Sequence, residues 1–154
     1  MIQASLSASP STSTAPASAN LGSILKGAAL GGLASAVGNY VVYGASIAAG
    51  VDFLGRYQGP DSPVSGVPVP MIGVSSFVPA LVGGLLYAGL AKLTSRSRGV
   101  FAAVATILTV LSFGGPASIA GASPGTKIAL SVMHVVAAVF IVGGIFRGAR
   151  ASRS

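Results

Sequence analysis

The stretch that decides the fold is TKIALSVMHVVAAVFIVGGIF, residues 126–146. It is apolar over nearly its whole length, and its one charged residue, Lys127, lies at its start. A helix rises about 1.5 Å per residue, so about 20 apolar residues cross a hydrocarbon core about 30 Å thick. Backbone N–H and C=O groups in hydrocarbon must bond one another, and a helix achieves this within one segment. The stretch therefore predicts a transmembrane helix.

Three further apolar stretches precede it, at about 24–51, 71–93 and 99–120. Each is close to the length that a membrane-spanning helix needs. Alanine, glycine, leucine and valine dominate them without a clean helical period, as expected where lipid and protein both meet apolar side chains. The predicted fold class is all-α, a membrane bundle of four transmembrane helices within one domain, residues 21–147.

The composition agrees with this fold and excludes several classes of protein. Of 154 residues, 52% are hydrophobic and only 7% are charged, against about 25% charged residues in soluble domains. Surface solubility needs more charge than this. Because the chain has no cysteine, it cannot be a disulfide scaffold or hold a thiolate-bound metal.

Two segments outside the bundle differ in composition from it. Residues 1–20 are rich in Ser, Ala, Thr and Pro and carry no charged side chain, which predicts a disordered leader. Residues 148–154 form a predicted basic tail. Between the first two spans, residues 55–70 contain four prolines and predict an extended polar loop.

Local signals mark some helix boundaries. Ser123 and Pro124 are typical of an N-cap followed by the first helical residue. The run Gly114-Gly115-Pro116 should interrupt the third span, because proline lacks an amide and glycine weakens a helix. Pro79 lies inside the second span and predicts a kink there.

The positions of the charges predict the orientation. Arg56, Lys127 and both acidic residues, Asp52 and Asp61, fall on one side of the spans. Basic residues are retained on the cytoplasmic side of a membrane. The side with more of them also holds both ends of the chain, so both termini should be cytoplasmic. The predicted location is the inner (plasma) membrane of a cell, with the lipid bilayer as partner. Nucleic-acid binding is not expected, because the basic residues form no patch with aromatic residues. Seven basic residues fall on the cytoplasmic side: Lys26, Lys92, Arg96, Arg98, Arg147, Arg150 and Arg153.

Polar side chains inside a membrane are costly and mark candidate sites. We expect six of these polar side chains to converge on one pocket in the outer half of the bundle, away from the cytoplasm. His134 is the one histidine of the chain. It is either a ligand-binding group or a structural imidazole bonded to Asn39, Tyr43 or Ser131, and the structural role is favoured because buried polar groups usually have partners. Ser75 and Thr106 are also polar positions inside the spans. The candidate pocket residues are Asn39, Tyr43, Ser76, Thr109, Ser112 and His134.

Two further features concern helix packing. Gly27 with Gly31, and Ala28 with Gly32, have the small-xxx-small spacing that permits close helix approach. This spacing is weak evidence for a dimer. At the outer end of the first span, Asp52 has Lys127 and Arg56 as candidate counter-charges, and an Asp52–Lys127 pair would join the first helix to the last.

No catalytic set is visible in the sequence. It contains no acid–base pair, no nucleophile with a histidine and an acid, and no phosphate-binding loop, so an enzyme is not expected. No cofactor and no metal site are predicted, since one histidine without cysteine cannot form a zinc cage. The spans also lack the deep carboxylate that proton- or sodium-coupled transporters use.

The final third of the chain resembles a family of small bacterial four-helix membrane proteins classed as a domain of unknown function. The matching features are Leu111-Ser112, Gly115-Pro116 and Met133-His134. The first span, with Asn39, Tyr43 and its exit Gly50-Val51-Asp52, is also similar. The resemblance covers about residues 24–147. It implies a bacterial inner-membrane protein with four helices, and it supplies no activity.

Three functions follow as hypotheses. The favoured one is a non-enzymatic interaction module, either an accessory subunit of a membrane-protein partner or a self-assembling homo-oligomer. The second is the binding of a lipophilic small molecule, a quinone or a lipid, in the outer-half pocket around His134. The third is a transporter or channel formed by oligomers.

Overall fold

The computed structural model describes residues 20–151. The expected leader, except for Asn20, lies outside the described residues, as do residues 152–154. Four segments are long and apolar enough to cross a membrane, which confirms the four-helix, all-α membrane fold. The elements in chain order are α1 (Leu21–Ala48), β1 (Leu54–Gly55), β2 (Ser65–Gly66), α2 (Val69–Leu93), α3 (Ser97–Ser112), α4 (Gly114–Ser118) and α5 (Pro124–Ala151).

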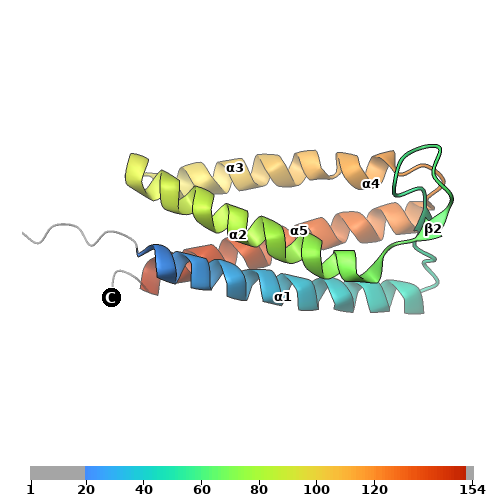
Figure 1. Ribbon diagram of the computed structural model, residues 1–154, viewed down its shortest axis with the longest axis horizontal. Coiled ribbons are helices and arrows are strands. Elements are labelled where there is room, and N and C mark those ends of the chain that lie inside the picture. Colours follow the sequence, from blue (N-terminus) through green and yellow to red (C-terminus); the bar gives the residue numbers. More distant parts are fainter. Residues whose placement is uncertain (1–19, 152–154) are drawn as a thin grey trace, which may run out of the picture.

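The long helices run side by side along the longest axis of the molecule (Figure 1). Helix α1 packs against α5 and α2, whereas α3 packs against α2 and α5. The β1–β2 hairpin and α4 cover one end of the bundle, and the start of α1, the α2–α3 turn and the end of α5 lie at the opposite end (Figure 1). The described basic residues of the predicted cytoplasmic side therefore share one end: Lys26, Lys92, Arg96, Arg98, Arg147 and Arg150.

Glycine permits α1 and α5 to approach until their backbones touch. Gly27 and Gly31 of α1 face Gly144 and Gly148 of α5. A Cβ atom added to Gly144 would lie 2.7 Å from the Cα of Gly31, and one added to Gly27 would lie 2.8 Å from the Cα of Gly148. Real Cβ atoms do not come within 3.0 Å of such atoms. Close backbone contact of this kind is a main source of helix association in membranes.

The neighbouring face of α1 makes a similar contact with α2. A Cβ added to Gly84 would lie 2.8 Å from the Cβ of Ala28, and one added to Gly32 would lie 2.9 Å from the Cβ of Ala80. Both small-xxx-small pairs of α1 are thus used within one chain. The spacing is therefore accounted for by contacts of α1 with α2 and α5, and it gives no separate support for a dimer.

Helix α3 is held mainly by aromatic contacts near its first turns. Only Ser97 and Phe101 of this helix are buried. The Phe101 ring packs edge-on against Tyr87 of α2, with 5.4 Å between centroids, and against Phe146 of α5 at 5.9 Å. Arg98 lies over the Phe146 ring, 5.8 Å from its centroid. These rings belong to the main apolar core, whose buried members are Ile24, Ala28, Ala80, Tyr87, Phe101, Ile141, Ile145 and Ala149.

The third span is interrupted, as predicted, although the break lies at Phe113 and not at the Gly-Gly-Pro run itself. An amide at Pro116 would bond the carbonyl of Ser112, four residues earlier, and proline has no such amide. The Phe113 amide instead donates to the carbonyl of Val110 at 3.2 Å, a tighter turn. Helix α4 then continues to Ser118, so the chain is helical again directly after the break.

The segment expected as an extended polar loop forms a small folded cap. Leu54 pairs with Gly66 and Gly55 with Ser65 in an antiparallel hairpin. The Arg56 amide donates to the Ala120 carbonyl at 3.0 Å, which ties the hairpin to the connection before α5. Phe53 adopts a φ of 51°, rare for a bulky residue, and its ring is buried. Its centroid lies 4.7 Å from that of Tyr43.

The ends of α5 confirm one boundary and correct another. The helix begins at Pro124, and the Ser123 hydroxyl accepts from the Thr126 amide at 3.2 Å, as an N-cap does. At the other end, the expected basic tail begins inside the helix, which reaches Ala151. Gly148 and Ala149 are buried, because the close contact with α1 continues past residue 147.

The predicted Asp52–Lys127 ion pair does not form. The Thr126 hydroxyl donates to Asp52 Oδ1 at 3.1 Å, and Lys127 Nζ donates to the Ala117 carbonyl at 3.0 Å. Asp52 therefore joins the end of α1 to the start of α5 through a hydroxyl one residue before the expected lysine.

Candidate functional site

His134 lies on α5 and is partly buried. Its Nδ1 is 2.7 Å from the carbonyl oxygen of Leu130, one turn earlier in the same helix. A carbonyl only accepts hydrogen bonds, so Nδ1 carries the hydrogen. In the neutral imidazole with this tautomer, Nε2 presents a lone pair. Within residues 20–151, Nε2 has no hydrogen-bond partner. His134 is therefore oriented by its own helix and keeps one acceptor for another molecule.

None of the three expected structural partners bonds His134. Asn39 Nδ2 donates to Ser76 Oγ at 2.9 Å, and the Ser131 hydroxyl donates to the Lys127 carbonyl at 2.8 Å. Tyr43 packs against Phe53 near the hairpin. Serine near the middle of a helix readily bonds the carbonyl one turn earlier, which removes Ser131 from the reach of the imidazole.

Asn39 and Ser76 form a buried polar contact between α1 and α2. The Ser76 hydroxyl accepts from Asn39 and donates to the Ile72 carbonyl at 2.8 Å. Asn39 is 5% exposed, and its Oδ1 has no partner in the described part of the chain. A buried acceptor without a partner is costly and marks a position where a donor fits.

His134 and Asn39 both line a small hollow between α1, α2 and α5. Its volume is about 130 Å³, enough for a few water molecules. Asn39 is therefore a lining residue whose side-chain oxygen has no partner in the described part of the chain. The remaining lining residues are Val67, Met71, Ile72, Ser75, Leu130, Met133 and Ala137.

His134 also lines a larger hollow between α2, α3 and α5, with a volume of about 400 Å³. Most of its lining is apolar, and its polar residues lie toward the hairpin end of the helices. Ser75 is in the second turn of α2, and Ser112 is the last residue of α3. The lining residues are Ser75, Pro79, Val82, Gly83, Leu86, Phe101, Val104, Ala105, Leu108, Thr109, Ser112, His134, Ala137, Ala138, Ile141 and Val142.

The hydroxyls of this larger hollow all donate to their own helices. Ser75 donates to the Ile72 carbonyl at 3.2 Å, Thr109 to the Ala105 carbonyl and Ser112 to the Thr109 carbonyl, each at 2.7 Å. Their oxygens therefore keep lone pairs, as does His134 Nε2. The polar end of the hollow consists of acceptors, so it is complementary to a molecule that donates hydrogen bonds.

The predicted pocket residues thus divide into three groups. Thr109, Ser112 and His134 line the larger hollow, and Asn39 shares the smaller one with His134. Ser76 is turned away and buried against Asn39. Tyr43 lines neither hollow and instead supports the hairpin.

Ser75 is outside the predicted pocket set, and yet it lines both hollows. Adjacent residues on a helix point about 100° apart, so only one of Ser75 and Ser76 can face α3 and α5. Nothing in the sequence showed which. Within residues 20–151, no group of three or more His, Asp or Glu side chains is placed to hold a metal ion.

Comparison with known proteins supports the resemblance noted above. A search of the curated proteins and a search of the solved structures each returned no match. One family model matches the chain over residues 19–151, which includes every described helix. It is the model of a family of unknown function, and its match covers His134 and both hollows. This chain of four apolar helices belongs to that family, DUF6069.

Proposed function

We propose that this protein binds a lipophilic small molecule in the hollow between α2, α3 and α5, with the polar head of that molecule at His134. The observation that carries the proposal is the position of His134, with a free acceptor nitrogen, at the polar end of an apolar hollow of about 400 Å³. Ligand sites commonly have this character: a mostly apolar lining of some 300–1,000 Å³ with a few oriented polar groups.

The length of the hollow suits a ring with a short tail or a lipid chain. Ser75 and Leu86 line its opposite ends on α2 and are eleven residues apart. At about 1.5 Å per residue, this separation is about 16 Å. The polar head would lie near Ser75, Ser112 and His134, and the apolar part would extend toward Leu86 and Phe101.

The chemistry of the lining selects the head group. Because the hydroxyls and His134 Nε2 all offer lone pairs, a hydroxyl-bearing head is favoured over one that only accepts. A quinol has such hydroxyl donors, whereas the corresponding quinone presents carbonyl acceptors only. We therefore propose a quinol or another hydroxyl-bearing lipophile as the ligand class.

A ligand would enter from the side. Val82, Leu86 and Leu108 line the hollow and are 61%, 42% and 56% exposed, and in a bilayer such exposed apolar side chains face lipid. A lipophile dissolved in the membrane would reach His134 between α2 and α3 without passing through water.

The charges support a location and an orientation for this site. We propose an inner-membrane protein with both termini in the cytoplasm, because positive charge is retained on the cytoplasmic side and six of the eight described basic residues lie at the end of the bundle where α1 begins and α5 ends. The polar end of the hollow would then lie in the outer half of the membrane.

Ligand binding replaces self-assembly as the favoured function, because the feature that favoured self-assembly has another explanation. The small-xxx-small spacing of α1 packs against α2 and α5 of the same chain, so it no longer favours a homo-oligomer. The hollow at His134, in contrast, has the size and the polarity that the ligand-binding hypothesis requires.

A competition between a quinol and its quinone tests the proposal. Protein in lipid nanodiscs would be equilibrated with short-chain ubiquinol or short-chain ubiquinone, and the retained compound would be measured by mass spectrometry of the extract. We expect preferential retention of the quinol and a loss of about tenfold in affinity for His134→Ala, as the removal of one hydrogen bond predicts. Ser131→Ala is the matched control, since Ser131 lies one turn away on α5 and lines neither hollow. Equal retention by wild type and His134→Ala, or tighter binding of the quinone, would contradict the proposal.

A further inference from the structure

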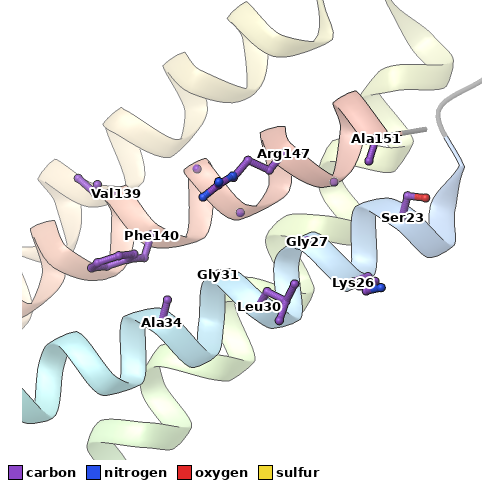
Figure 2. A pocket seen from close by; sticks show the side chains of 13 residues that line it. Ser23, Lys26, Gly27, Leu30, Gly31, Ala34, Val139, Phe140, Arg147 and Ala151 are labelled. Carbon is purple, nitrogen blue, oxygen red and sulfur yellow. The ribbon is translucent and has the colours of Figure 1, made fainter. Parts of the chain in front are cut away.

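A third concave surface lies at the opposite end of the bundle, along the contact between α1 and α5. It is a groove of about 550 Å³ (Figure 2). Its floor is glycine backbone, since Gly27, Gly31 and Gly144 line it. Leu30 of α1 and Phe140 of α5 form parts of its apolar walls. The glycines that bring the helices together therefore also leave a channel along them.

Two cationic side chains flank this groove, Lys26 on α1 and Arg147 on α5 (Figure 2). Both are exposed. Within residues 20–151, neither has a hydrogen-bond acceptor or an acidic partner, and no acidic residue lines the groove. The two acidic residues of the chain, Asp52 and Asp61, follow α1 near the hairpin, at the far end of the bundle. The groove thus combines an apolar floor with an uncompensated positive charge.

The position of the charges matches the boundary of a membrane. Lys26 is in the second turn of α1, and Ala34, eight residues further on, lines the inner end of the groove. This distance is about 12 Å along the helix. Side chains of lysine and arginine near the end of a span reach the head-group region. The groove therefore begins at the head groups and runs into the hydrocarbon.

We propose that this groove is a binding site for one anionic phospholipid, with its head group at the end of the groove that carries Lys26 and Arg147 and an acyl chain along Gly27, Gly31 and Gly144. The net negative charge of the lipid complements the two cations, in the manner of basic pockets that bind lipid head groups. A second copy of this chain is a poorer occupant, because a symmetric pair would place Lys26 and Arg147 against their own equivalents.

Gly143 provides a way to fill the groove without disturbing the fold. It lines the groove, yet a Cβ atom added to it would meet nothing within 4 Å. Gly143→Leu therefore leaves the α1–α5 contact intact and places a side chain where the acyl chain would lie. The charges of Lys26 and Arg147 remain unchanged in this variant.

The test is native mass spectrometry of protein extracted from vesicles that contain phosphatidylglycerol and phosphatidylcholine in equal amounts with the same acyl chains. Wild type should retain one phosphatidylglycerol. The double variant Lys26→Gln/Arg147→Gln should reduce this retention by about thirtyfold, from two lost head-group contacts, and Gly143→Leu should also abolish it. Lys92→Gln/Arg96→Gln is the control, because it removes the same charge at the same end of the bundle outside the groove.

Other outcomes would overturn the proposal. If Gly143→Leu retains phosphatidylglycerol while the charge variant loses it, the lipid binds to surface charge and not in the groove. Equal retention of both lipids by wild type, or equal losses in the two charge variants, would also contradict a defined site. If wild type is a dimer that Gly143→Leu converts to monomers, a second copy occupies the groove instead. Neither variant changes a residue at the His134 hollow, so failure here leaves the quinol proposal intact.

Discussion

Helix α5 makes two contacts of opposite character. Toward α1, Gly144 and Gly148 meet Gly27 and Gly31 at a distance that excludes any added Cβ. Toward α3, apolar side chains enclose a hollow of about 400 Å³, and α3 is anchored chiefly through Phe101. Both contacts are apolar. In a membrane, where lipid removes the hydrophobic drive between helices, packing distinguishes a rigid contact from one that admits another molecule.

The largest expected effect on stability comes from breaking the close contact between α1 and α5. Gly144→Ala places a Cβ 2.7 Å from the Cα of Gly31, so the helices must separate, at a cost of about 1–3 kcal/mol. Gly143→Ala is the matched control, with open space around the added atom, and should be neutral or stabilising by up to about 1 kcal/mol. Unfolding of both variants in bicelles measures the difference. Equal stability of the two would show that the glycine contact is not close.

The next largest effect should be a loss of local stability that is confined to α3. Phe101→Ala removes ring contacts with Tyr87 and Phe146, each worth about 0.5–1.5 kcal/mol. Amide hydrogen exchange should accelerate in α3, while α1 and α5 remain protected. A uniform acceleration over all four spans would instead mean that α3 and the α1–α5 contact open as one unit.

A smaller effect on stability is expected from the hydrogen bond that joins α1 and α2. The Asn39–Ser76 hydrogen bond lies beside the close contact and borders the small hollow. A double-mutant cycle of Asn39→Ala and Ser76→Ala should give a coupling energy of about 0.6 kcal/mol, the average for hydrogen bonds between membrane helices. Additive losses would indicate that the two side chains do not bond.

The smallest effect concerns the hairpin, which covers the end of the bundle. Burial, with the nearby Asp52 carboxylate and Tyr43, raises the pKa of Tyr57 above its usual value of 10.0. The protonated phenol, which donates to the Phe53 carbonyl at 2.7 Å, is the form that the fold favours. Its stabilising contribution is therefore complete below pH 10 and is lost as the pH rises through the higher pKa of the folded state.

Absorbance titration checks this expectation. The difference between the titrations of wild type and Tyr57→Phe should correspond to one tyrosine that ionises above pH 10.0. The alkaline loss of stability should shrink in the same variant. A wild type in which no tyrosine ionises late would contradict the assignment.

Much of the fold could be predicted because it follows from single segments. The length of 126–146 and its composition dictate a span, and the missing amide of Pro116 dictates a break nearby. Ser123 and Pro124 carry their capping signal in two adjacent residues. Each of these features depends on the residues of one continuous segment, which the sequence displays directly.

The site was harder to predict because it depends on which helix faces which. The Gly27–Gly31 spacing predicts a close neighbour without identifying it as α5. Ser75 and Ser76 are chemically equivalent, and only the packing of α2 assigns one to the hollow and the other to Asn39. The sequence predicts Asn39, Tyr43 or Ser131 as a partner of His134, yet its ring contacts the Leu130 carbonyl of its own helix instead. The folded hairpin likewise depends on contacts with a distant segment, through Ala120.

The most direct test of the central proposal uses the one histidine of the chain. Protein labelled with ring-¹⁵N histidine, purified through a histidine-free tag, gives solid-state NMR signals from His134 alone. We expect a protonated Nδ1 and a bare Nε2 in the free protein, and a shift of the Nε2 signal when short-chain ubiquinol is added but not when ubiquinone is added. An Nε2 signal that is unchanged by the quinol, or a ring with the hydrogen on Nε2, would contradict the account.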